Sequence, residues 1–169
     1  MTKRTELSDQ QKIFFDQLRN GGWDKPPGIQ NLGIRPEDWL QEVRYGYTLY
    51  QWPNTGDRDI NTGRVFGGWV AGLSDHIVSM TMASALEDGE WFTTTELQTR
   101  ILRPVPHGLI RIEGRLVSRG RTTGFVEADW HDETGRHLAR ISAAKAIRSL
   151  EELRGPEAAQ RLKPTGSPA

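Results

Sequence analysis

The stretch VFGGWVAGLSDHIVSMTMASAL, residues 65–86, decides the fold of this chain. It contains no Lys or Arg, its only acidic residue is Asp75, and it ends at Glu87-Asp88-Gly89. Its length favours a buried helix over a strand, and its apolar character is too interrupted for a membrane span. We therefore expect a helix that is apolar on all sides and lies at the centre of a domain.

Strand-like alternation of apolar and polar residues flanks this helix on both sides. One run precedes it and four follow it, at residues 43–53, 95–101, 110–116, 125–130 and 138–147. An antiparallel sheet has to bury its apolar face, and the central helix is the one element that can cover it. The pattern predicts an α+β fold in which a curved antiparallel sheet wraps around one long helix. A generic α+β sandwich has the same composition and stays open as the alternative.

The ends of the chain differ in composition from this middle part. Residues 8–19 have helical spacing after an N-cap at Ser8, residues 23–35 are typical of a loop, and Pro36 can begin a short helix. We expect an N-terminal helical and loop extension at residues 1–40 and the main domain at residues 41–150. A short C-terminal helix and a frayed tail are expected at residues 151–169.

Charge and composition argue against several classes of partner and cofactor. The 22 Lys and Arg balance the 22 Asp and Glu, so net charge gives no reason to expect nucleic acid or an anionic membrane as a partner. The chain has no cysteine, its N-terminus has no apolar segment, and its four histidines show no metal-ligand spacing. Neither a G-x-S-x-G nucleophile turn nor a phosphate-binding loop is present. We expect a cytoplasmic protein that needs no metal and no cofactor.

Asp75 is the residue that does not fit an apolar helix. A buried carboxylate without a partner costs several kcal/mol, so it needs either hydrogen bonds or a function. Helical spacing places small residues beside it on one stripe, which consists of Gly68, Ala71, Asp75, Ser79 and Met82. Such a stripe leaves room for a ligand. The alternative, an Asp75 that is ion-paired for structural reasons, has equal standing at this stage.

Gly67 and Gly68 begin the same helix. Amides at a helix N-terminus lack intrahelical partners and suit a carbonyl oxygen that gains negative charge. Gly67 and Asp75 are about 12 Å apart along a straight helix, so we expect the glycines to bend back towards Asp75. Simple close packing of the helix start is the alternative. His76 points about 100° away from Asp75 and is expected in the core or at an interface.

Four consecutive pieces of sequence resemble the hotdog-fold thioesterases of the phenylacetate-degradation type. They are VFGGWVAGLSD, TTTELQTRILRPVP, GLIRIEGRLVSRGRT and TGFVEADWHDETGRHLARISAAKAI. The resemblance covers about residues 43–148 and implies a hotdog fold. It also implies that the Gly67 amide polarises a thioester carbonyl and that Asp75 acts as general base or nucleophile. It further implies that a hydroxyl group from the partner subunit, at Thr94 here, orients the water.

Candidates for substrate binding come from the helix and from the resemblance. At the helix they are Phe66, Gly68 and Ser79. The resemblance implies that the turn of Arg119, Arg121 and Thr122 lies near the CoA nucleotide. A solvated basic turn is the alternative for these three residues. At two positions the chain departs from the family, because Phe66 replaces its histidine and Ile60 its amide residue. The neighbouring Asn61 is the candidate substitute for that amide.

The function that this resemblance implies is hydrolysis of an acyl-CoA, or a related acyl thioester, to the free acid and CoA. Two other functions on the same fold stay open: a non-catalytic module that binds acyl-CoA, and an enoyl-thioester hydratase or dehydratase. A single hotdog unit exposes an edge strand and half of its pocket, so a homodimer or homotetramer is expected.

Overall fold

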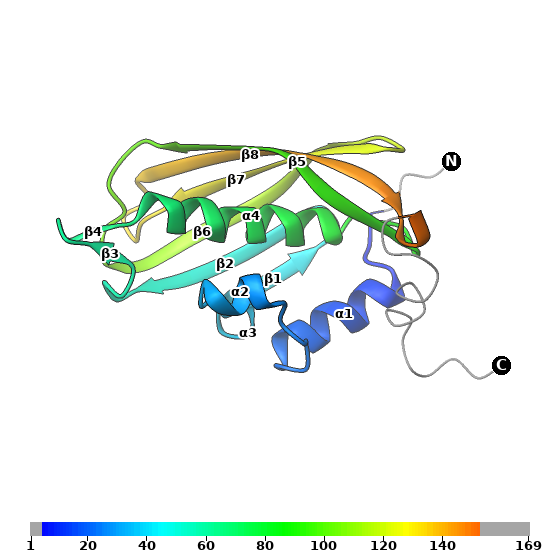
Figure 1. The fold of residues 1–169 in the computed structure, drawn as a ribbon, viewed down its shortest axis with the longest axis horizontal. Helices are drawn as coiled ribbons and strands as arrows, with labels where there is room; N and C mark the ends of the chain where they lie inside the picture. Colours follow the sequence, from blue (N-terminus) through cyan, green and yellow to red (C-terminus); the bar gives the residue numbers. More distant parts are fainter. Residues whose placement is uncertain (1–4, 153–169) are drawn as a thin grey trace.

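A six-stranded antiparallel sheet and one long helix form the centre of the computed structural model, which describes residues 5–152. The order of the strands is β1-β2-β6-β7-β8-β5, and β3 and β4 form a separate hairpin. The elements are α1 (Asp9–Arg19), α2 (Pro27–Asn31), α3 (Pro36–Trp39), β1 (Leu40–Arg44), β2 (Tyr47–Asn54), β3 (Asp59–Ile60), β4 (Arg64–Val65), α4 (Gly67–Ala83), β5 (Glu90–Ile101), β6 (Gly108–Arg119), β7 (Thr123–His131) and β8 (His137–Ser149) (Figure 1).

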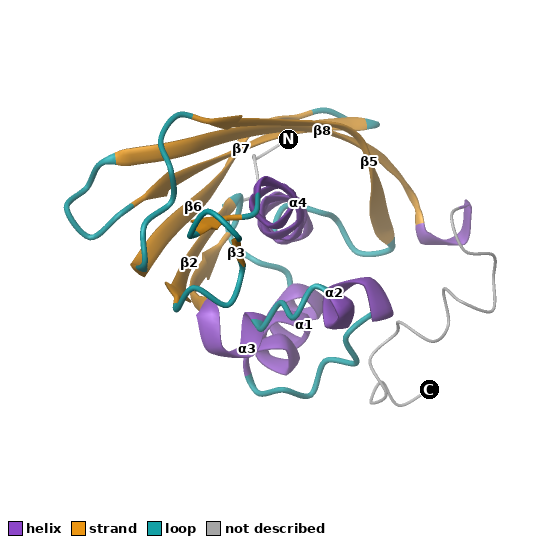
Figure 2. Cartoon of the chain, turned by 60° about the vertical axis from the view of Figure 1, so that its left-hand side comes forward, coloured by secondary structure: helices purple, strands orange, loops and turns teal. Residues whose placement is uncertain are grey.

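The sheet curves around α4, as Figure 2 shows in a view almost along the helix. Leu73, Ile77 and Val78 of α4 are fully buried, as are Tyr50 of β2 and Ile112 of β6. The core is therefore the layer between the helix and the concave face of the sheet. The predicted α+β architecture, a curved antiparallel sheet around one central helix, is confirmed.

The structure corrects three local predictions. The strand predicted at residues 43–53 is a hairpin of β1 and β2, because Gly46 has a φ of +66° and turns the chain. The helix predicted from Pro36 ends at Trp39, where β1 takes over, and the loop predicted at residues 23–35 contains α2. The predicted C-terminal helix and tail lie outside the described residues except for residues 151 and 152.

The N-terminal helices cover a side of α4 that the sheet leaves open (Figure 2). Helix α1 starts with the predicted Ser8 cap, in which Ser8 and Gln11 bond each other's backbone amides. The Gln11 amide group also donates to the carbonyl oxygens of Ala83, at 2.9 Å, and Leu86, at 2.6 Å. These two bonds satisfy carbonyl groups at the end of α4 and anchor α1 there.

The buried, neutral His76 should make the folded protein less stable in acid. Burial lowers its pKa to about 4, and the Tyr50 hydroxyl lies 3.2 Å from its Nε2. The unfolded chain takes up this proton near pH 6.5, so unfolding is favoured increasingly as the pH falls from 6.5 towards 4, by roughly 3 kcal/mol. Urea denaturation at pH 7 and pH 4.5 measures the loss. His76→Phe removes the titrating group and should reduce the difference; an unchanged difference would contradict this origin.

Candidate active site

Asp75 lies on the face of α4 that is turned towards β5, and 44% of its side chain is exposed. The sequence-based expectation of a buried carboxylate is therefore wrong for the single chain. Gly68 is exposed and Ala71 and Ser79 are half-buried, whereas Met82 at the far end of the stripe is buried. Most of the small-residue stripe is thus accessible, which is the arrangement that a ligand or a second chain requires.

A compact polar cluster surrounds one oxygen of this carboxylate. Asp75 Oδ1 accepts from the Thr94 hydroxyl at 3.2 Å and from Lys145 Nζ, also at 3.2 Å. Lys145 donates in addition to Thr94 Oγ1 at 2.7 Å and to Ser79 Oγ at 2.9 Å. Three elements supply the cluster, α4, β5 and β8, and no hydrogen bond to Asp75 Oδ2 is found among the described residues. That oxygen is available to a substrate or a water molecule.

Lys145 is the residue of this cluster that the sequence analysis missed. Lys145 is completely buried on the inward face of β8. The same face carries the buried residues Ala139, Ile141, Ala143 and Ile147. A single lysine at an inward position of an apolar strand was the available signal. Burial lowers the pKa of Lys145, and the negative charge of Asp75 opposes that change. The ion pair between Lys145 and Asp75 also agrees with the alternative in which Asp75 is ion-paired for structural reasons.

Strand pairing explains why Thr94 meets Asp75. Thr94 of β5 lies opposite Lys145 of β8, and a bulge follows it between Thr94 and Glu96. Residues paired in this way point to the same face of the sheet, here the face that carries α4. The sequence analysis assigned the hydroxyl to the partner subunit. Within one chain, Thr94 already contacts Asp75, and the assignment to the partner subunit stays a prediction.

The start of α4 also differs from the expectation. Gly67 is the first residue of the helix, and no bend brings it back to Asp75, so the two remain about 12 Å apart along the helix axis. Its N-cap, Phe66, offers no side-chain hydrogen bond to the helix. The ring of Phe66 lies over Gly68, where a Cβ would come within 2.5 Å of it. Gly67 and Asp75 of one chain therefore cannot act on the same carbonyl group.

The predicted CoA-binding turn is only partly available. Arg119 forms an ion pair with Glu90 and is largely covered, so it is not free to bind a phosphate. Arg121 and Thr122 are exposed and line a surface hollow of about 650 Å³. Arg148, which the sequence analysis did not single out, lines the same hollow. Asn61 is exposed in the turn between β3 and β4, away from the cluster around Asp75.

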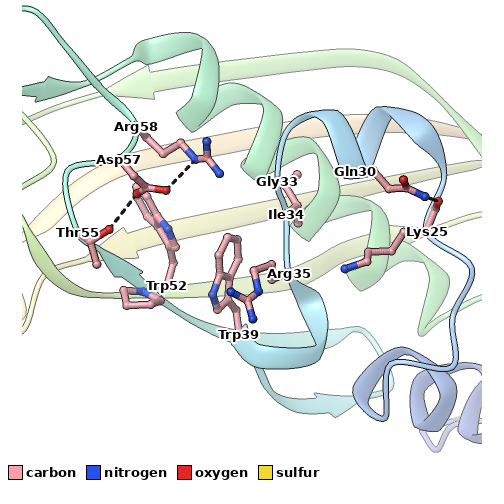
Figure 3. Close-up of a pocket in the computed structure, with 11 residues that line it drawn as sticks. Lys25, Gln30, Gly33, Ile34, Arg35, Trp39, Trp52, Thr55, Asp57 and Arg58 are labelled. Atoms are coloured by element: carbon pink, nitrogen blue, oxygen red, sulfur yellow. Dashed lines mark hydrogen bonds and ion pairs between the residues drawn. The ribbon is translucent and has the colours of Figure 1, made fainter.

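A second hollow, of about 550 Å³, lies between α2, α3 and the loop after β2 (Figure 3). Its cations already have anionic partners: Lys25 Nζ lies 2.5 Å from Glu37, and Arg58 Nε lies 3.5 Å from Asp57. None of the residues lining it belongs to the polar cluster of Asp75. We therefore place the candidate chemistry at Asp75.

Among the described residues, no group of histidine and carboxylate side chains could hold a metal ion. No helix in residues 5–152 has the length and apolar character needed to cross a bilayer.

Comparisons with known proteins give one family model and several similar structures. Residues 62–139 match the thioesterase superfamily model. A phenylacetic acid degradation-related protein from Ralstonia eutropha JMP134 is 26% identical, with a TM-score of 0.66, over 79% of this chain and 98% of that chain. A Haemophilus influenzae thioesterase is 18% identical, with a TM-score of 0.68, over 80% of this chain and 90% of that one. A Streptococcus mutans protein bound to acetyl CoA is 20% identical, with a TM-score of 0.61, over 65% of this chain and 87% of that one.

The similarities to the Haemophilus influenzae and Streptococcus mutans proteins, at 18% and 20% identity, show the fold alone. A search of curated proteins gave no match. The resemblance found in the sequence, to hotdog-fold thioesterases of the phenylacetate-degradation type, is confirmed.

Proposed function

This chain carries the domain of the thioesterase superfamily, and we propose that it hydrolyses an acyl-CoA, or a related acyl thioester, with Asp75 as the catalytic carboxylate. The observation that carries the proposal is the asymmetry of this side chain. One carboxylate oxygen is held by Thr94 and Lys145, while nearly half of the side chain is exposed. An anchored carboxylate with a free oxygen suits proton transfer or direct attack.

The chemistry needs one water molecule per thioester. As general base, Asp75 takes a proton from water while the water oxygen bonds to the thioester carbon. The carbonyl oxygen becomes negative, and the intermediate then expels the CoA sulfur, which recovers the proton from Asp75. As nucleophile, Asp75 would itself bond to the carbon and expel the CoA sulfur as a thiolate, which leaves an anhydride. Water then hydrolyses the anhydride to the free acid and the Asp75 carboxylate, and the proton released in this step goes to the CoA thiolate. Both routes give the free acid and the CoA thiol, and both need a donor for the oxyanion.

We assign that donor to Gly67 of a second copy of the chain. The amide at the start of α4 has the right chemistry, but its distance from Asp75 excludes a site within one chain. Strand β5 is 12 residues long, lies at the edge of the sheet and has one buried residue, Phe92. Pairing of this edge with a second copy would bring another α4 beside the face of Asp75. A homodimer, or a tetramer built from it, follows from this assignment.

The hollow at Arg121 and Arg148 is the proposed site of the CoA phosphates. Arg148 lies three residues beyond Lys145 on β8, about 10 Å along the strand from the catalytic cluster. The pantetheine arm of CoA separates the nucleotide from the thioester, which fits a phosphate site at a distance from Asp75. Arginine is well suited to bind phosphate groups.

Reversing both charges, as Arg121→Glu with Arg148→Glu, should raise KM for an acyl-CoA by about 10-fold or more, because charge-assisted hydrogen bonds are lost. The kcat should change little, and the difference from the parent should shrink at high salt. The matched control is an acyl-pantetheine, which has no nucleotide and should show the same KM with both proteins. An unchanged KM for acyl-CoA would show that neither arginine binds the CoA phosphates and would leave Arg121 with the solvated-turn interpretation.

The proposed function is tested by measuring the release of free thiol from a panel of aryl and aliphatic acyl-CoAs. Hydrolysis of at least one acyl-CoA at a rate far above the spontaneous rate supports the proposal. Binding of acyl-CoA without thiol release would indicate a non-catalytic module. Hydration of an enoyl-CoA without release of CoA would indicate a hydratase on the same fold.

A further inference from the structure

Lys145 is a fully enclosed cation. Its relative exposure is 0%, and its ammonium group lies 5.3 Å from the centre of the Phe92 ring. The three donors of the ammonium group match three acceptors, namely Asp75 Oδ1, Ser79 Oγ and Thr94 Oγ1. All of its hydrogen-bonding capacity is therefore used inside the chain. A substrate cannot reach it, so a direct chemical role for Lys145 is excluded.

Stability alone gives little reason to keep a lysine at this position. The desolvation of a buried ion offsets much of its attraction to a counterion, and apolar replacements of buried ion pairs are often neutral or stabilising. The neighbours of Lys145 on the inward face of β8 are apolar. Asp75 is half-exposed, so water can solvate it without a partner. What the lysine does supply is geometry, because it joins α4, β5 and β8 at one point.

The hydrogen-bond directions around Thr94 carry the argument further. Thr94 Oγ1 accepts from Lys145 and therefore turns its own proton towards Asp75 Oδ1. With Oδ1 held by two donors, Asp75 can present only Oδ2 freely. The Thr94 hydroxyl then keeps one lone pair with which it can accept a hydrogen bond from an incoming water.

We propose that Lys145 is a positioning residue, which locks Asp75 and Thr94 so that Oδ2 and the Thr94 lone pair face the same incoming water. This inference rests on the proposed thioester hydrolysis at Asp75. Lys145 acts only through these two side chains and never contacts the substrate. Without the ammonium group, the Asp75 side chain would be free to rotate and Thr94 could turn its proton elsewhere.

The test is Lys145→Met, which fills the same space without charge. We expect kcat to fall by about 100-fold, the size of effect known for small misplacements of catalytic groups. KM should stay within about 2-fold of the parent, because substrate contacts are unchanged. The melting temperature should be equal or higher. The matched control is Arg140→Met, also on β8, whose cation pairs with Asp129 outside the cluster and whose loss should leave kcat unchanged.

A second measurement separates positioning from a general structural role. In an Asp75→Asn background, Lys145→Met should cause no further loss of kcat, because the two side chains act as one unit. Independent losses that add would contradict the inference. Should Lys145→Met fail to fold, Lys145→Gln replaces it in both comparisons, and a parental kcat in Lys145→Gln would then contradict the inference.

The possible failures are distinguishable. Thiol release that Asp75→Asn abolishes but Lys145→Met leaves at the parental kcat would overturn the role of Lys145 and leave the proposed function intact. A parent protein that releases no thiol from any acyl-CoA would remove the proposed function itself.

Discussion

Replacing Asp75 by asparagine is expected to lower kcat for thioester hydrolysis by at least about 100-fold, the usual size of a general-base contribution. Asparagine keeps the shape of the side chain but can neither take a proton from water nor attack the thioester carbon. KM should change much less, because the carboxylate is assigned to chemistry and not to binding. Release of CoA thiol at saturating substrate measures the effect, and near-parental turnover in Asp75→Asn would end the assignment.

The same substitution should also lower stability. From the sequence, a catalytic Asp75 predicts unchanged folding and a structural Asp75 predicts a loss, but the structure combines a half-exposed carboxylate with a buried ammonium partner. Asp75→Asn leaves Lys145 without its anion, at a cost between that of an exposed and that of a buried pair, about 1–3 kcal/mol. Adding Lys145→Met removes the orphaned charge and should restore the melting temperature. A double variant as unstable as Asp75→Asn would contradict this explanation.

Gly67→Pro is expected to lower kcat by about 100- to 1000-fold, as does the loss of one oxyanion donor in other enzymes. Proline deletes the N–H that is proposed to bind the carbonyl oxygen. The helix should tolerate it, because Gly67 is the first helical residue and Phe66 before it has extended backbone angles, with φ of −60° and ψ of 124°.

Gly67→Ala is the matched control, since it keeps the N–H. A Cβ at this position would lie 3.6 Å from Ile101 Cδ1, which is an ordinary contact, so the alanine variant should retain far more activity. Thermal unfolding checks that both variants fold. Equal kcat values for the proline and alanine variants would show that the amide has no part in catalysis.

The sequence predicted the elements that periodicity controls. The apolar stretch of residues 65–86 and the alternating runs after it identified α4 and β5 to β8, because burial on one side of a sheet imposes a period of two residues. It failed at Gly46, where a single glycine with positive φ splits one predicted strand into two. Such a turn depends on local backbone geometry, which the apolar pattern does not record.

The site was predictable only where side chains lie close in sequence or match the family. Asp75 and Gly67 were identified from α4 alone, but Lys145 and Arg148 were not, because both depend on pairing between strands far apart in the chain. Arg119 was selected because its turn resembles the family segment near the CoA nucleotide, and its partner Glu90 becomes visible only once β5 and β6 are placed in space. The burial of a group and the identity of its partner are tertiary properties that a linear pattern cannot contain.

The most direct test of a site shared between two copies is a mixture of two inactive variants. Asp75→Asn chains retain the Gly67 amide, and Gly67→Pro chains retain the carboxylate. If the two groups act from different copies, co-refolded mixed dimers contain one intact site, and random pairing should restore about a quarter of the parental kcat. If both groups act within one chain, or if neither acts on the thioester, the mixture will release CoA no faster than the average of the two variants alone, and the account will be contradicted.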